Sequence, residues 1–123
     1  MSGGVRFARY VFGAAGIYGL LCALGMYLNP AVLGTMQPVP LVFFYGFAGV
    51  VLAWQIAFLI IASDPLRYRL LMLAALVEKI TFVIAVAILQ NQGPLPLELI
   101  VGAASDGLLF VLFALSYFLT RRA

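Results

Sequence analysis

One stretch decides the fold of this chain: Leu70-Leu-Met-Leu-Ala-Ala-Leu-Val-Glu-Lys-Ile-Thr-Phe-Val-Ile-Ala-Val-Ala-Ile-Leu89. A helix of about 20 apolar residues crosses the roughly 30 Å hydrocarbon core of a bilayer, so this stretch predicts a transmembrane helix. Glu78 and Lys79 stand near its middle, where each ionised side chain costs about 2.5–3.5 kcal/mol on insertion scales. We therefore expect both side chains to face the protein interior rather than lipid.

The composition of the whole chain supports the same class. Of its 123 residues, 66% are hydrophobic and 9% are charged, and the mean hydropathy is +1.17. Soluble domains carry about 25% charged residues, so residues 1–123 are expected to form a single integral membrane domain. Histidine is absent and Cys22 is the one cysteine. We accordingly expect no internal disulfide, no metal site and no cofactor.

Four apolar spans follow one another, at about residues 10–28, 41–62, 66–89 and 99–119. They predict an all-α fold, a four-helix transmembrane bundle with antiparallel up-and-down topology. A cleavable signal peptide is the alternative for the first span, but its apolar run is longer than the 7–15 residues of a signal core. Small residues are spaced by four on the first two spans, which predicts faces for close helix packing: Ala15, Gly19 and Ala23, then Gly49, Ala53 and Ala57.

Helix boundaries are also marked in the sequence. Asn29-Pro30 is expected to end the first span. Asp64 and Pro65 are expected to be the N-cap and the first helical residue of the third span. Pro96 and Glu98 suit the first turn of the fourth, since a carboxylate is favourable beside a helix N-terminus.

The arginines predict the orientation. With four spans, all six arginines fall on one side of the membrane: Arg6, Arg9, Arg67, Arg69, Arg121 and Arg122. The two loops on the other side, about residues 29–40 and 90–98, contain no Lys or Arg. Because short loops rich in Lys and Arg stay in the cytoplasm, both termini are expected to be cytoplasmic, in a cell inner or plasma membrane. Basic residues spread in this way indicate topology and not a nucleic-acid partner.

Polar residues inside the spans predict an intramembrane polar cluster: Trp54, Gln55, Glu78, Lys79, Thr81 and Asp106. At 1.5 Å per residue from the cytoplasmic helix ends, Gln55 lies about 10 Å deep, Glu78 about 12 Å and Asp106 about 20 Å. Glu78 and Lys79 are adjacent, so they point about 100° apart and are not expected to pair with each other. The long stem of Lys79 is expected to reach Asp106.

The charges of this cluster do not cancel, because one cation faces two carboxylates. We expect one of Glu78 and Asp106 to be protonated near neutral pH while the other pairs with Lys79, and the sequence leaves open which. A carboxyl group that is protonated in this way acts as a proton carrier, as a hydrogen-bond donor to a lipophilic ligand, or as a clamp between helices. No residue is assigned a catalytic role.

Several motifs together resemble small four-span bacterial integral membrane proteins of unassigned function: Trp54-Gln55, Asp64-Pro65-Leu66-Arg67-Tyr68-Arg69, Glu78-Lys79 and Asp106. The resemblance covers spans two to four and implies the architecture alone. Small multidrug transporters are excluded because their essential carboxylate lies in the first span, which has none here. Fluoride channels are excluded because their Gly-Thr…Asn and Thr-Thr-Phe-Ser stretches are missing.

Three classes of function remain. The first expectation is a non-enzymatic accessory or assembly subunit of a larger membrane complex. The alternative is a small proton-linked transporter or channel acting as a homo-oligomer, since four short helices enclose little volume. A membrane enzyme using Glu78 or Asp106 as acid or base beside Trp54 is the third, disfavoured because no catalytic motif accompanies them. In each of these three classes, the protein is expected to be embedded in the lipid bilayer.

Overall fold

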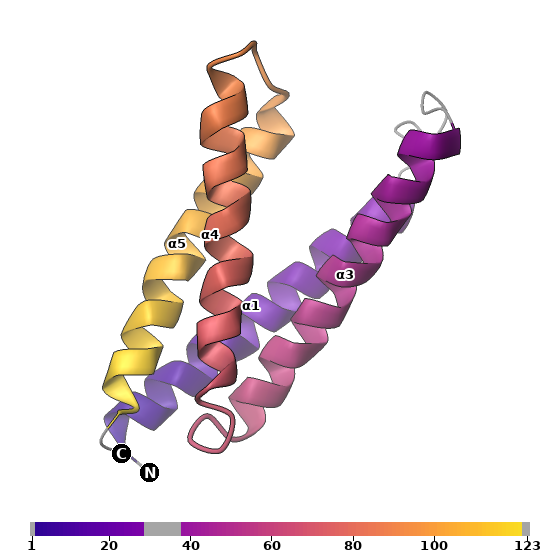
Figure 1. The fold of residues 1–123 in the computed structure, drawn as a ribbon. Coiled ribbons are helices and arrows are strands. Elements are labelled where there is room, and N and C mark those ends of the chain that lie inside the picture. Colours follow the sequence, from indigo (N-terminus) through magenta and orange to yellow (C-terminus); the bar gives the residue numbers. More distant parts are fainter. Residues whose placement is uncertain (1, 29–37, 122–123) are drawn as a thin grey trace.

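The protein is an all-α four-helix bundle, as the sequence predicts (Figure 1). The computed structural model describes residues 2–28 and 38–121, which form α1 (Gly3–Leu28), α3 (Pro38–Ser63), α4 (Leu71–Gln90) and α5 (Leu97–Leu119). All four helices are long and apolar enough to cross a bilayer, so this is a multi-pass membrane protein. The expected helix end at Asn29-Pro30 and the terminal Arg122 lie outside the described residues.

The first helix begins earlier than the apolar span, at Gly3 rather than near Tyr10. The hydroxyl oxygen of Ser2 accepts a hydrogen bond from the backbone N–H of Val5 at 3.1 Å, the pattern of a serine N-cap. Arg6 and Arg9 therefore lie on the helix itself and not in a tail before it.

The predicted start of the third span is wrong in position. Asp64 Oδ1 accepts a hydrogen bond from the backbone N–H of Arg67 at 3.4 Å, but this turn is not continuous with α4, which begins at Leu71 after the N-cap Leu70. Residues 65–70 form the connection in which the chain reverses. Asp64 and Pro65 thus begin the connecting turn and not α4. The chain needs residues 65–70 to reverse direction between the two antiparallel helices.

The helices associate as two pairs, α1 with α3 and α4 with α5, joined by contacts between α1 and α5, whereas α3 and α4 touch little. Figure 1 shows the pairs close together at the end that holds both chain termini and spread apart toward the opposite end. The α3–α4 connection lies at the close end. This end therefore also carries the described arginines of the predicted cytoplasmic side: Arg6, Arg9, Arg67, Arg69 and Arg121.

Close packing of α1 on α3 depends on glycines of α1. A Cβ built on Gly19 would overlap the side chain of Gln55, and one on Gly16 would lie 2.7 Å from Cδ2 of Leu59. Ala15 and Ala23 of the predicted small face are buried, but Ala53 of the face predicted on α3 is exposed. The small residues of α1 therefore receive larger side chains of α3, instead of meeting a second small face.

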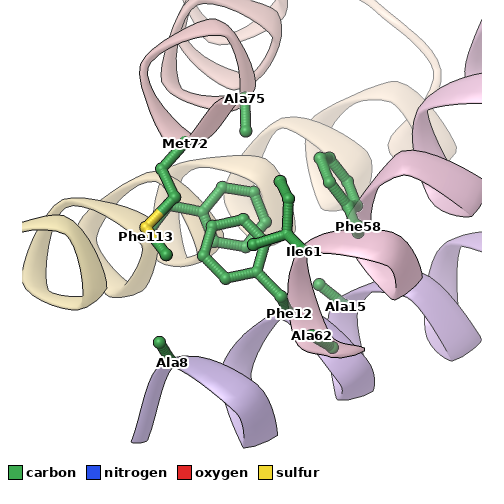
Figure 2. Close-up of a cluster of buried hydrophobic side chains, with 9 residues drawn as sticks. All are labelled: Ala8, Phe12, Ala15, Phe58, Ile61, Ala62, Met72, Ala75 and Phe113. Carbon is green, nitrogen blue, oxygen red and sulfur yellow. The ribbon is translucent and has the colours of Figure 1, made fainter. Parts of the chain in front are cut away.

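An aromatic core fills the close end of the bundle (Figure 2). Phe12 of α1 stacks on Phe113 of α5 with ring centroids 4.1 Å apart, and Phe58 of α3 meets Phe113 edge-on at 5.0 Å. Ile61 and Met72 are fully buried around them. Because aromatic pairs in this geometry add to the stabilisation from buried area, the core ties the two helix pairs together at this end.

Candidate functional site

A cavity of about 430 Å³ lies between the helix pairs, directly beyond the aromatic core. All four helices line it, and its polar lining residues include Gln55, Glu78, Lys79, Thr81, Ser105 and Asp106. One helical turn separates Ala75, a core residue, from Lys79. Ligand-binding cavities measure about 300–1,000 Å³ and combine apolar walls with a few convergent polar groups, and this cavity has both properties.

Lys79 is the centre of the polar cluster. Its side chain is 6% exposed, and Nζ lies 3.1 Å from Oδ1 of Asp106 on α5, to which it donates a hydrogen bond. The same Nζ lies 5.2 Å from the centre of the Phe58 ring on α3, within the range of a cation–π contact. Groups from two other helices thus compensate one buried ammonium, and the contact expected with Asp106 is present.

Glu78 and Lys79 also pair, contrary to the expectation from their positions on α4. Glu78 Oε2 lies 3.6 Å from Lys79 Nζ. Their Cα–Cβ bonds diverge, but both side chains are long enough for their ends to meet. Glu78 Oε2 is buried and accepts no hydrogen bond from the described residues. The carboxylate of Glu78 is therefore less well compensated than that of Asp106.

Among the described residues, no hydrogen bond joins the other three predicted members to the charged groups of Glu78, Lys79 and Asp106. Gln55 donates through Nε2 to the carbonyl of Val51 at 2.8 Å, and Thr81 donates to the carbonyl of Glu78 at 3.2 Å. Both side chains line the cavity. Trp54 does not, because it packs against Phe58 at a centroid distance of 6.0 Å, as part of the surroundings of the aromatic core.

Tyr18 and Ser105 were not singled out from the sequence, yet they join α1 to α5 beside the cluster. The Tyr18 hydroxyl donates to Oγ of Ser105 at 3.2 Å. Both residues line the central cavity and also a second cavity of about 300 Å³, with Leu108 on its wall. This pair therefore stands between the two cavities. A serine within an apolar span was the one available signal in the sequence.

Arg69 has a structural role that the charge pattern did not reveal. Its Nη2 donates to the carbonyl of Tyr117 at 2.7 Å, and its Nε donates to Oγ1 of Thr120 at 3.1 Å. The guanidinium carbon lies 3.7 Å from the centre of the Tyr117 ring. Arg69 thus satisfies one backbone carbonyl and one hydroxyl group at the C-terminal end of α5, where cations are favourable. Arg67 is exposed and lies 5.5 Å over the ring of Tyr68.

The chemistry available at the cluster is ionic. Within residues 2–28 and 38–121, no group of three His, Cys, Asp or Glu side chains is arranged to hold a metal ion. An ammonium and two carboxylates that face a cavity can bind a charged group or accept and release a proton. Ionisable residues inside a membrane protein commonly mark the pathway of a substrate, an ion or a proton.

No family model matches the chain, and no match to it is found among curated proteins or solved structures. The resemblance to small four-span bacterial proteins therefore stays a prediction.

Proposed function

We propose that this membrane protein is a small proton-linked transporter whose cargo binds at the ion cluster of Glu78, Lys79 and Asp106. The observation that carries the proposal is the position of this cluster in the cavity wall next to the aromatic core, one helical turn from the core residue Ala75. Cargo and coupling-ion sites of membrane transporters commonly lie near the middle of the membrane, between packed helices.

The charges of the cluster provide a reason for proton linkage. When all three groups are ionised, one negative charge is left over beside the cavity, and either a proton or a cationic group compensates it. Binding of either one lowers the affinity of the cluster for the other, so proton binding and cargo binding are linked at this site. The other titratable side chains that line the cavity are Tyr18 and Cys22, both from α1.

The cavity favours transport over the role of assembly subunit that the sequence suggested first. A clamp between helices needs the pair of Lys79 and Asp106 but no open volume beside it. The helices of one chain line the cavity, so a homo-oligomer is not needed to bring its lining residues together. From the distribution of basic residues we propose that the arginine-bearing end is cytoplasmic, in an inner or plasma membrane, which places the cavity on the far side of the aromatic core from the cytoplasm.

Proton flux in liposomes tests the proposal. Purified protein is reconstituted with a pH-sensitive dye inside, the membrane voltage is clamped with potassium and valinomycin, and a pH gradient is applied. We expect the gradient to decay faster than in protein-free liposomes, and Glu78→Gln and Asp106→Asn to return the rate to that of protein-free liposomes.

The matched control is Glu98→Gln, which removes an exposed carboxylate at the start of α5 and should leave the flux unchanged. A parent protein that conducts no faster than empty liposomes would contradict transport. That result, together with a membrane protein that copurifies in a fixed ratio, would favour the assembly subunit.

A further inference from the structure

We propose that the cargo of this cavity is a small organic cation, an amine with an apolar body, whose ammonium group binds Glu78. The inference rests on the proposed function, because it names the class of molecule that the same site takes. It is drawn from the different surroundings of the two carboxylates, from the cation already present, and from the walls of the cavity.

The two carboxylates differ in what compensates them. Asp106 accepts a hydrogen bond from Lys79 at 3.1 Å, whereas Glu78 Oε2 lies 3.6 Å from the same nitrogen and accepts no hydrogen bond from the described residues. A buried acceptor without a donor is costly. The Glu78 side chain is 19% exposed and lines the cavity, so an ammonium group in the cavity supplies the missing positive charge beside its carboxylate, and Glu78 gains from a cationic ligand.

An anionic ligand fits the site poorly. Lys79 is the one cationic side chain that lines the cavity in the described ranges. Its ammonium already contacts two carboxylates and the ring of Phe58. An anion would have to separate Lys79 from Asp106 and leave a carboxylate unpaired in a buried position, which is strongly unfavourable.

A bare metal cation also fits poorly, and the walls of the cavity explain why. Ca²⁺ takes six to eight oxygen ligands and Mg²⁺ takes six. The cavity instead presents large apolar surfaces beyond the cluster, among them Phe47 and Phe82, whose ring centroids are 6.4 Å apart. Tyr18 adds a third aromatic ring. Aromatic faces attract organic cations and cover their apolar parts, so a ligand with a charged end and an apolar body matches both regions.

Equilibrium binding to the full-length protein in phosphatidylcholine nanodiscs tests the inference. The probes share one phenyl ring and a short chain but differ in charge: phenethylammonium, 2-phenylethanol and 3-phenylpropanoate. Isothermal titration is corrected with empty nanodiscs, because each probe also partitions into lipid. We expect saturable binding of phenethylammonium only, and a Glu78→Gln affinity about ten- to a hundredfold lower, as for loss of a charge-assisted hydrogen bond.

Two matched variants keep the test decisive if Glu78→Gln fails to fold. Gly102 lies on the cavity wall, where a Cβ would be 3.6 Å from Phe82, so Gly102→Leu should fill the cavity and abolish binding without touching a charge. Gly107 on the same helix has no heavy atom within 4 Å of a built Cβ and does not line the cavity. Gly107→Leu should therefore bind as the parent does.

Equal saturable binding of the alcohol would overturn the inference, as would preference for the carboxylate or an absence of saturable binding by phenethylammonium. These outcomes are separate from those of the flux experiment. If the amine binds at Glu78 and no proton flux occurs, the site is a cation site but the transport proposal fails. If cluster-dependent flux occurs and the amine does not bind, transport stands and the cation inference fails.

Discussion

The ammonium group of Lys79 on α4 lies 3.1 Å from the carboxylate of Asp106 on α5, and within the described residues this is the ion pair that joins two helices. It lies at the boundary between the aromatic core and the cavity. The pair therefore belongs both to the packing of α4 on α5 and to the candidate site. Experiments on stability and on transport can separate these two contributions.

Removing Lys79 alone should destabilise the protein more than removing the pair. Lys79→Ala leaves Glu78 and Asp106 without their buried cation, which should cost about 3–5 kcal/mol. The double variant Lys79→Ala/Asp106→Asn should recover part of that loss, because one uncompensated carboxylate is gone. Unfolding in mixed detergent micelles measures both. Equal losses in the single and double variants would show that the ion pair contributes nothing as a pair.

Gly19→Ala should weaken the packing of α1 on α3. The added methyl group would overlap the side chain of Gln55, and overpacking of this kind costs about 1–3 kcal/mol. Gly25→Ala on the same helix meets no neighbour and should be neutral or stabilising by up to about 1 kcal/mol. Adding Gln55→Ala to Gly19→Ala should relieve the overlap, so additive losses in thermal unfolding would contradict the contact.

Arg69→Ala should destabilise the close end of the bundle by about 1.5–3 kcal/mol, the contribution of hydrogen bonds from a charged donor. Its partners are the carbonyl of Tyr117 and the hydroxyl of Thr120. Arg67→Ala is the natural control, since Arg67 is exposed and surface changes usually stay within about 0.5 kcal/mol. A similar unfolding midpoint for both variants would argue against the docking role of Arg69.

Both termini should be protected from external protease in intact cells. The basic residues predict this orientation, and epitope tags at either end measure it by blotting after digestion. Arg67→Glu/Arg69→Glu should produce a mixture of topologies. Glu98→Arg places a positive charge at the opposite end of the bundle, so it should also weaken the preference for cytoplasmic termini. Digestion of one tag alone would require an odd number of crossings and would contradict the orientation.

Cys22 should react with a membrane-impermeant maleimide added outside intact cells. Its side chain is exposed and lines the cavity, on the portion of α1 toward the end remote from the arginines. Filling the cavity with Gly102→Leu should slow labelling, whereas Gly107→Leu should not. Labelling that occurs only after the cells are opened would place the mouth of the cavity on the cytoplasmic side.

The sequence by itself determined the number of crossings, their antiparallel order and the side on which the arginines gather. These properties depend on apolar length and on charge along the chain, which are local quantities. It also placed Glu78, Lys79 and Asp106 in neighbouring layers around the middle of the membrane, because rise per residue converts position in a helix into distance across the bilayer.

Only the tertiary structure decided which of these residues meet. Contacts between helices depend on how each helix is rotated about its axis and on the angles at which helices cross, and both are set by packing over the whole bundle. For this reason Gln55 lies against Gly19, Trp54 joins the aromatic core, and Arg69 reaches the end of α5. The cavity arises in the same way, because the helix pairs meet at the aromatic core and spread apart beyond it.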